Sequence, residues 1–285
     1  VTVSLSSSLA LSLSGTITNV AVPDIMGSFG VGQDQAQWMA TAFFAAMTAA
    51  MLLSDWLTRA FGMRSVFIIM MVLFFAGSVA GGTAQTYGIV VLGRAVQGFA
   101  AGVILPLTMM AMFGVFPPQR RAMVAGLFGI SFIMGPGLGP WFGGMAIDAF
   151  DWRFTFYVAL PVAFVSIMLA SAVFPGRDRN ATKSRLDWFG FLLVALFLTA
   201  MLTGLSNGQL KGWSSDFVVG ALCLGLGSFI GFIFWELIVA DPIFDIRLLR
   251  NPKFAFACLA SFLVGATMFG SFYLQPVFVQ IVQNY

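Results

Sequence analysis

Histidine is absent from the 285-residue sequence, and cysteine occurs only twice, at Cys223 and Cys258. Both cysteines fall inside long apolar runs, so the sequence offers neither a disulfide framework nor the clustered ligands of a zinc site. The absence of histidine also excludes a histidine general base. Since no paired acids lie within an apolar run either, we predict no metal, no cofactor and no enzymatic active site.

Charge is scarce as well. Charged residues make up 9% of the chain and hydrophobic residues 59%, whereas an average soluble protein is about 25% charged. Nine apolar runs are long enough to cross about 30 Å of hydrocarbon. They lie near 2–23, 37–57, 66–84, 88–114, 122–147, 154–175, 188–206, 217–239 and 254–282. We therefore predict an all-α polytopic membrane protein, a bundle of about nine transmembrane helices.

The net charge of +3 is distributed unevenly between the loops. The loops after every second run hold Arg59, Arg64, Arg120, Arg121, Arg177, Arg179, Lys183, Arg185, Arg247, Arg250 and Lys253. The loops on the other side hold only Arg153 and Lys211. This bias follows the positive-inside rule and predicts that the N-terminus is cytoplasmic. It explains the basic charge without a nucleic-acid partner.

A polar segment at 176–187, GRDRNATKSRLD, carries six charges in twelve residues and marks the expected domain boundary. A second polar segment, at 241–253, precedes the last apolar run. The first run has no basic segment before it, so we expect a genuine transmembrane helix rather than a signal peptide, with its leading residues missing. Nine spans fit poorly with paired repeats, so we expect the natural chain to continue beyond Tyr285.

The run from Gly129 to Gly144, GISFIMGPGLGPWFGG, is interrupted at regular spacing by residues that break soluble helices. These breakers are Gly135, Pro136, Gly139, Pro140 and Gly143. In soluble helices Pro costs about 3 kcal/mol and Gly about 1 kcal/mol relative to Ala. Glycines four residues apart form a groove that another helix backbone can approach closely. The pattern is typical either of a tight helix crossing in any polytopic protein or of a helix with a role in transport.

Arg94, in VVLGRAVQGFAAG, is the only basic residue placed well within an apolar run. An arginine at the centre of a membrane costs about 2.5–3.5 kcal/mol, so it is a functional-site hypothesis by default. Gln97 lies one helical turn away, and Gly98 and Gly102 clear room on the same helix. Alternatively, the Arg94 side chain snorkels to the outer interface.

The first run is rich in polar side chains, namely Ser4, Ser6, Ser7, Ser8, Ser12, Ser14, Thr16, Thr18 and Asn19. We expect at least one of its faces to line a polar cavity or to pack against other helices. Alternatively, the hydroxyls bond back to carbonyls of their own helix. Trp38, Phe43 and Phe44 in the second run are further candidates for a ligand cavity, although most of the 32 phenylalanines must face lipid or pack between helices.

The tight turn SDWLTRAFGMR, between the second and third runs, carries Asp55, Arg59, Gly62 and Arg64. Opposite charges beside a glycine turn can latch helix ends together. The alternative is that these charges only satisfy the positive-inside rule.

No Asp or Glu lies at the middle of any run. Asp24 and Asp34 belong to the outer loop, and Asp55 and Glu236 to cytoplasmic ends. A proton relay normally needs an intramembrane carboxylate or histidine, and these residues do not provide one.

Taken together, the motifs resemble the major facilitator superfamily, and within it the fourteen-helix drug:proton antiporters of the EmrB-like multidrug efflux type. GISFIMGPGLGPWFGG resembles the antiporter motif of the fifth helix, LGRAVQGFAAG the fourth-helix motif, and SDWLTRAFGMR the loop between helices two and three. GTITNVAVP resembles the first-helix signature, FDWRFTFYVALP the start of the sixth helix, and DPIFDIRLLRNPKF the segment before the second half.

The resemblance implies an N-terminal six-helix bundle at 1–175 and a cytoplasmic linker with two extra transmembrane helices at 176–253. The first helix of a truncated C-terminal bundle then lies at 254–285. It implies an antiporter motif made of Gly135, Pro136, Gly139, Pro140, Gly143 and Gly144, and a cytoplasmic gate loop made of Asp55, Arg59, Gly62 and Arg64.

Four positions depart from the family pattern. Ser14 stands where the first-helix signature usually has Asp, which weakens the case for proton coupling through this half. In the loop motif, Asp55 replaces the usual leading Gly and Arg59 the usual acidic residue, so the latch is inverted or lost. Ala159 replaces a common Asn.

The predicted function is export of hydrophobic or amphiphilic small molecules across the bacterial cytoplasmic (inner) membrane, by alternating access and coupled to protons. Arg94 and Gln97 would tune the proton-linked step or hold a substrate group, and Ser14, Thr16, Asn19 and Trp38 are the candidate cavity residues. The glycine face of the fifth helix would pack the two halves together. A periplasmic adaptor and an outer-membrane channel are implied partners. A proton-linked permease for a small nutrient and a non-transporting membrane scaffold remain open alternatives.

Overall fold

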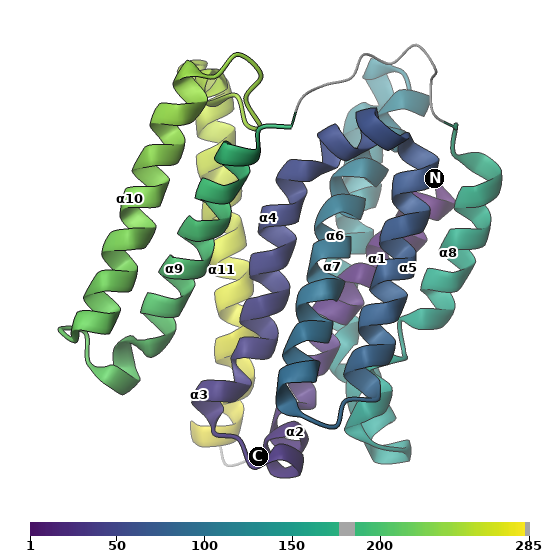
Figure 1. The fold of residues 1–285 in the computed structure, drawn as a ribbon. Coiled ribbons are helices and arrows are strands. Elements are labelled where there is room, and N and C mark those ends of the chain that lie inside the picture. Colours follow the sequence, from purple (N-terminus) through teal and green to yellow (C-terminus); the bar gives the residue numbers. More distant parts are fainter. Residues whose placement is uncertain (177–185, 283–285) are drawn as a thin grey trace.

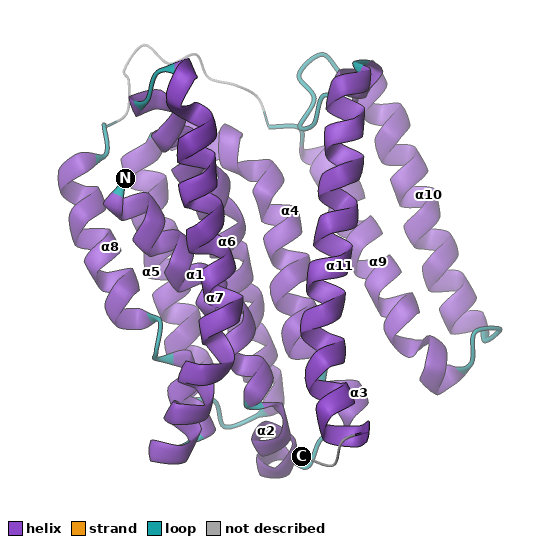
Figure 2. Cartoon of the chain, turned by 180° about the vertical axis from the view of Figure 1, so that it is seen from behind, coloured by secondary structure: helices purple, strands orange, loops and turns teal. Residues whose placement is uncertain are grey.

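The computed structural model describes residues 1–176 and 186–282, with side chains of the last helix described as far as Met268 (Figure 1). All regular structure in this part of the chain is helical (Figure 2). The α-helices are α1 (Thr2–Val20), α2 (Val22–Phe29), α3 (Gln33–Ala36), α4 (Trp38–Phe61), α5 (Met63–Gly82), α6 (Tyr87–Val115), α7 (Arg121–Ala149), α8 (Leu160–Val173), α9 (Trp188–Lys211), α10 (Asp216–Ile238) and α11 (Pro252–Val282). Short 3-10 turns lie at Pro118–Arg120, Trp152–Phe156 and Ile246–Arg250.

Seven helices of the described residues are long and apolar enough to cross a membrane. The helix pair α1 and α2 would make an eighth span if it counts as one bent element. The fold is therefore the predicted all-α membrane bundle. The ninth predicted span corresponds to α11, whose searched part, Pro252–Met268, is apolar but shorter than the others, so this span stays a prediction.

The first predicted run, at 2–23, is wrong at its end. Helix α1 stops at Val20, and the chain bends by 57° into α2. Pro23 sits in the first turn of α2, where its missing N–H is tolerated, whereas its ring would clash with a continuing α1. Helix α2 then ends at Phe29 and is capped by Gly30, which takes the left-handed conformation (φ 64°) that favours glycine.

Helices α1 and α4 to α8 pack together, and α9 and α10 form a hairpin on the α4 side of this six-helix group (Figure 1). Helix α6 contacts α1, α4, α5 and α7, so it lies at the centre of the group. Its glycines allow this: a β-carbon added to Gly98 would overlap the main-chain carbonyl of Phe43, and one on Gly102 that of Met47. The backbones of α4 and α6 therefore touch, which brings Phe43 close to the polar residues of α6.

Residues 177–185, which hold most of the predicted boundary segment, lie outside the described residues. So do the basic side chains Arg177, Arg179, Lys183 and Arg185 that contribute to the predicted loop charge. The division of the chain at this segment stays a prediction.

Candidate functional site

Arg94 is fully buried in the first half of α6, with 0% of its surface exposed. Its Nη1 donates to the main-chain oxygen of Ser14 (2.9 Å) and to Oε1 of Gln97 (3.0 Å). Its Nη2 donates to the main-chain oxygen of Gly15 (3.3 Å). The side chain thus points to α1 rather than to the outer interface, which excludes the snorkelling alternative.

A ring and a polar chain complete the surroundings of Arg94. Its guanidinium carbon lies 4.2 Å from the ring centroid of Phe43, a cation–π geometry. Gln97, also fully buried, donates from Nε2 to Oγ of Ser78 on α5 (2.8 Å). The network therefore links α1, α4, α5 and α6 around one cation.

Among the described residues no carboxylate pairs with Arg94. The cation is stabilised by carbonyl dipoles, an amide and an aromatic face, and its Nε has no hydrogen-bond partner. Ser14 stands at the position where the family resemblance expects an acid, and its contribution is a main-chain carbonyl. Backbone carbonyls carry no sequence signature, so this mode of stabilisation was not predictable from the residue types.

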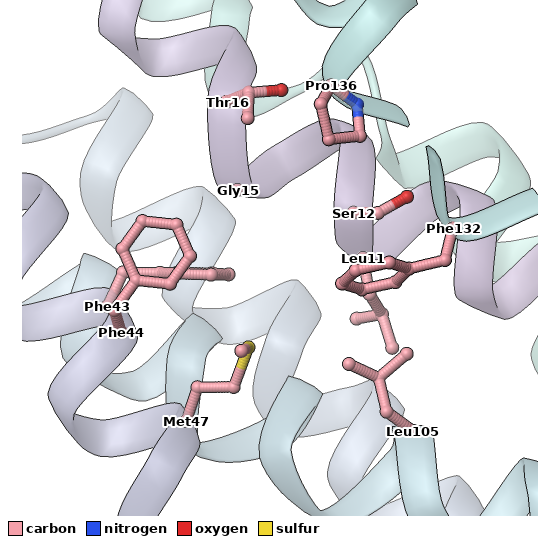
Figure 3. Close-up of a pocket in the computed structure, with 10 residues that line it drawn as sticks. All are labelled: Leu11, Ser12, Gly15, Thr16, Phe43, Phe44, Met47, Leu105, Phe132 and Pro136. Atoms are coloured by element: carbon pink, nitrogen blue, oxygen red, sulfur yellow. The ribbon is translucent and has the colours of Figure 1, made fainter. Parts of the chain in front are cut away.

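A small pocket, with a cavity volume of about 20 Å³, lies between α1, α4, α6 and α7 (Figure 3). It is lined by Leu11, Ser12, Gly15, Thr16, Phe43, Phe44, Met47, Leu105, Phe132 and Pro136. Its only polar side chains are the hydroxyls of Ser12 and Thr16, which donate to Leu9 (3.2 Å) and Leu13 (3.4 Å) of their own helix. The predicted back-bonding of hydroxyls is therefore present, and each oxygen keeps a lone pair that can accept a hydrogen bond.

Phe43 separates the pocket from the buried cation. Phe43 is 1% exposed, lines the pocket and also contacts the guanidinium of Arg94. A β-carbon added to Gly15 would lie 3.4 Å from the same ring, so the glycine gives the ring its place against α1. Arg94 is consequently not among the residues that line the pocket, and any effect it has there passes through Phe43.

A second, more open pocket of about 310 Å³ lies between α4 and α9. It is lined by Ala40, Thr41, Phe44, Ala45, Thr48, Leu198 and Leu202. Phe44 is common to both pockets and is half-buried. The sequence predicted Phe43 and Phe44 as cavity candidates, and the structure places both of them on pocket walls.

The glycine row of α7 faces α1, as close packing requires. A β-carbon on Gly135 would lie 2.5 Å from the main-chain nitrogen of Leu13, and one on Gly143 would lie 3.0 Å from the main-chain oxygen of Ile17. Gly139 fits against Thr16 in the same way. The close approach is present, and the neighbour is a helix of the same six-helix group. That this face also packs two halves together stays a prediction.

The remaining motif residues of α7 divide between two faces. Pro136 is buried and lines the first pocket, whereas Pro140 is exposed and Gly144 has open space beside it. Positions 135, 139 and 143 follow one stripe of the helix and 136, 140 and 144 the next, and of the second stripe only Pro136 is buried.

The other predicted cavity residues behave differently from one another. Thr16 lines the first pocket, and Ser14 supplies a carbonyl to Arg94 instead. Asn19 is exposed near the end of α1, and Trp38 is half-buried at the start of α4. Neither of these two lines a pocket described above. The sequence did not predict that Ser78 accepts a hydrogen bond from Gln97. The only indication was that Ser78 is a small polar residue among the glycines of GSVAGG.

In the predicted gate loop, Asp55 and Arg59 form an ion pair (2.6 Å) one turn apart within α4, with both side chains more than half exposed. This pair does not join two helices, because residues at i and i+4 share one helix face. Gly62 makes the turn with a positive φ of 83°. Arg64 donates to the main-chain oxygen of Ser171, so it connects α5 to α8. Of the four predicted gate-loop residues, Arg64 is therefore the one whose side chain links two helices.

Comparison with known proteins gives consistent results. Residues 5–283 match the sequence model of the Major Facilitator Superfamily. The multidrug export protein EmrB of Escherichia coli is 27% identical over 274 residues, which is 96% of this chain and 54% of EmrB. The multidrug resistance protein B homolog of Mycobacterium tuberculosis is 31% identical over 269 residues, 94% of this chain and 50% of the relative.

An uncharacterized MFS-type transporter of Bacillus subtilis, YhcA, is 28% identical over 268 residues, 94% of this chain and 50% of the relative. The chain thus spans about half the length of these curated relatives. Among solved structures, the peptide transporter POT in complex with sulfate superposes with a TM-score of 0.58 at 16% identity, covering 83% of this chain and 51% of that one. At that identity the likeness concerns the fold alone.

Proposed function

The chain belongs to the Major Facilitator Superfamily, and from this premise we propose that it is part of a proton-coupled exporter of hydrophobic or amphiphilic small molecules. Members of this family are membrane transporters and not enzymes, so the chain is a multi-pass membrane protein that handles small-molecule substrates. Beyond family membership, the proposal specifies export as the direction of transport, hydrophobic or amphiphilic molecules as the substrates, and the proton as the coupling ion. It also adopts the division into a six-helix bundle (1–175), a linker with two extra helices (176–253) and the start of a second bundle (254–285).

The observation that carries the proposal is the chemistry of the first pocket. Eight of its ten lining residues lack a hydroxyl, and the aromatic rings of Phe43, Phe44 and Phe132 form part of its wall. Small-molecule sites typically combine apolar walls and few polar groups with a volume of about 300–1,000 Å³. The first pocket has this wall composition with a cavity of about 20 Å³, and the second pocket, which shares Phe44 with it, has a cavity of about 310 Å³. The hydroxyl oxygens of Ser12 and Thr16 are acceptors for a polar or cationic group, so an amphiphile with one such group matches the wall. Relatives with names that describe multidrug export support the same substrate class.

Arg94 acts in this proposal as a positioning residue. Arg94 joins α1 to α6 by hydrogen bonds to two main-chain oxygens, and its guanidinium makes a cation–π contact with the Phe43 ring. Gln97 extends the link to α5. Loss of the cation would free the ring and loosen α1, and the pocket wall would lose its shape. Proton coupling would then depend on an acid outside the six-helix group, since no carboxylate of its described residues contacts Arg94.

The glycine row of α7 has a sealing role in the proposal. Gly135, Gly139 and Gly143 let α7 lie directly on α1, and this close packing would hinder leakage of water and protons between the two helices. We place the N-terminus in the cytoplasm and the protein in the bacterial inner membrane, with the loop of Asp55, Arg59, Gly62 and Arg64 on the cytoplasmic side. A periplasmic adaptor and an outer-membrane channel are the partners that this arrangement would use.

Accumulation of a fluorescent hydrophobic cation in a bacterial host that lacks its own exporters tests the proposal. Cells that express the full-length protein should accumulate less dye than cells without it, and Arg94→Ala should remove the difference. Arg120→Ala is the matched control, since Arg120 is an exposed loop residue of the same charge. Wild-type export by Arg94→Ala at equal membrane abundance would contradict the role of Arg94. Increased dye uptake would favour the permease, and unchanged uptake the scaffold.

A further inference from the structure

Two acidic side chains meet where α9 begins and α10 ends, away from both pockets. Asp187 caps the N-terminus of α9, where its Oδ1 accepts from the main-chain N–H of Gly190 (2.9 Å). The same oxygen accepts from the indole Nε1–H of Trp235 on α10 (2.9 Å). Its second oxygen, Oδ2, is buried and has no hydrogen-bond partner.

Glu236 lies in the last turn of α10 and is 0% exposed. Its Oε2 accepts from the main-chain N–H of Phe244 (3.2 Å), and its Oε1 is buried without a hydrogen-bond partner. Both unpartnered oxygens lie over Gly190. A β-carbon added to that glycine would meet Asp187 Oδ2 and would also lie 2.8 Å from Glu236 Oε1. The missing side chain of Gly190 therefore leaves room for both carboxyl oxygens beside the same backbone position.

The charged groups around the pair do not compensate two negative charges. The acids that act on Glu236 are Asp187 and Asp245, both of the same sign. Arg247 donates instead to the main-chain oxygen of Leu237 (2.9 Å). The other charged groups of these elements are exposed or lie at the far ends of α9 and α10: Lys211, Asp216, Asp241, Arg250 and Lys253. Within the part of the chain that the structure describes, no cation contacts either free oxygen.

A buried carboxylate without a partner is costly, and two carboxylates at one site cannot both stay ionised cheaply. The described residues contain no group of three or more His, Cys, Asp or Glu that could hold a metal ion. One bound proton is sufficient to stabilise the pair, because it neutralises one carboxylate and turns one acceptor oxygen into a hydrogen-bond donor to the other.

We propose that Asp187 and Glu236 form a proton-binding site, in which one proton is held between Oδ2 and Oε1. The proton is covalently bound to one carboxyl oxygen and hydrogen-bonded to the other, so the protonated pair carries a single negative charge. Release of the proton leaves two negative charges in contact across the ends of α9 and α10. The proton belongs to the pair rather than to either residue. The site lies in the linker hairpin, and its occupancy does not depend on export being the activity of the protein.

Infrared difference spectroscopy of the purified full-length protein in lipid nanodiscs tests the site without any substrate. The wild type should lose one protonated-carboxyl carbonyl band when the pH is raised from neutral to alkaline. Glu236→Gln and Asp187→Asn should each remove that band, whereas the control Asp245→Asn should keep it. Asn preserves the cap of α9, because its side-chain oxygen can still accept from Gly190. Identical spectra for wild type and Glu236→Gln, or a band that responds to sodium and not to pH, would overturn the proposal.

Thermal unfolding against pH gives a second measurement. The folded pair keeps a proton that an unfolded chain has already released at neutral pH, so the folded state binds more protons and its stability falls as the pH rises. The melting temperature of the wild type should therefore drop towards alkaline pH. In Glu236→Gln the amide N–H₂ donates permanently to Asp187, and this drop should disappear. An equally steep drop in Glu236→Gln would contradict the shared proton and leave the export proposal untouched.

Discussion

The contact between α1 and α7 can be tested at Gly135. A β-carbon at this position would lie 2.5 Å from the main-chain nitrogen of Leu13 and 2.6 Å from the main-chain carbon of Ser12. Non-bonded heavy atoms are normally about 3.5 Å apart or more, so Gly135→Ala must move the two helices apart by about 1 Å. The nearest atom, Oγ of Ser12, belongs to a side chain that can rotate away, but the other two atoms are backbone, so side-chain rotation cannot relieve the whole overlap.

The matched control is Gly137→Ala, two residues along the same helix, where an added β-carbon has nothing within 4 Å. Both substitutions gain about 0.8–1.0 kcal/mol of helix propensity, and this gain cancels when the two variants are compared. Overpacking costs about 1–3 kcal/mol. Gly135→Ala should therefore be less stable than Gly137→Ala by about 1–3 kcal/mol, or roughly 5- to 150-fold in the unfolding equilibrium constant.

Equilibrium unfolding of the purified protein in mixed micelles, followed as the fraction of denaturing detergent is raised, measures this difference. Dye export by the same variants shows whether the contact also matters for transport, and we expect Gly137→Ala to export normally. Equal unfolding midpoints for the two variants would refute the close packing of α1 on α7.

Two further substitutions test the contact between α4 and α6. Gly98→Ala would place a β-carbon against the main-chain carbonyl of Phe43, so it should lower the free energy of unfolding by about 1–3 kcal/mol. Gly88→Ala is the control, because a β-carbon there meets open space and should not lower stability. Similar unfolding midpoints for the two variants would contradict the direct contact between α4 and α6. Ser54→Ala removes a buried hydrogen bond from Oγ of Ser54 to the main-chain oxygen of Val103 (2.8 Å). It should cost about 0.6 kcal/mol in the same unfolding assay, and a loss of several kcal/mol would show that the hydroxyl has another role.

The helices could be predicted from the sequence because a membrane-spanning run needs a fixed length of apolar residues, and a lipid environment leaves few alternatives to a helix. The break after Val20 was missed, since Ala21 and Val22 continue the apolar run and only Pro23 signals the turn. The α7 glycines predicted a close helix neighbour, but their spacing says nothing about which helix it is. That choice depends on the tertiary arrangement of α1.

The candidate site was predictable in part. Arg94 and Gln97 stood out because polar groups inside apolar runs are costly, and they do lie in one network. The acceptors of Arg94 were not predictable, since every residue has a carbonyl and only the fold decides which ones face the guanidinium. The pairing of Asp187 with Glu236 was missed for a related reason. They are 49 residues apart in sequence and meet only because α9 and α10 form a hairpin.

Proton-driven exchange in proteoliposomes tests the central claim most directly. The full-length protein would be reconstituted, a pH gradient imposed, and the movement of a fluorescent hydrophobic cation followed across the vesicle membrane. The account predicts that the dye moves in the direction opposite to the protons, and that this movement stops with a protonophore or with Arg94→Ala. Movement of dye in the same direction as the protons, or no gradient-dependent movement at all, would contradict it.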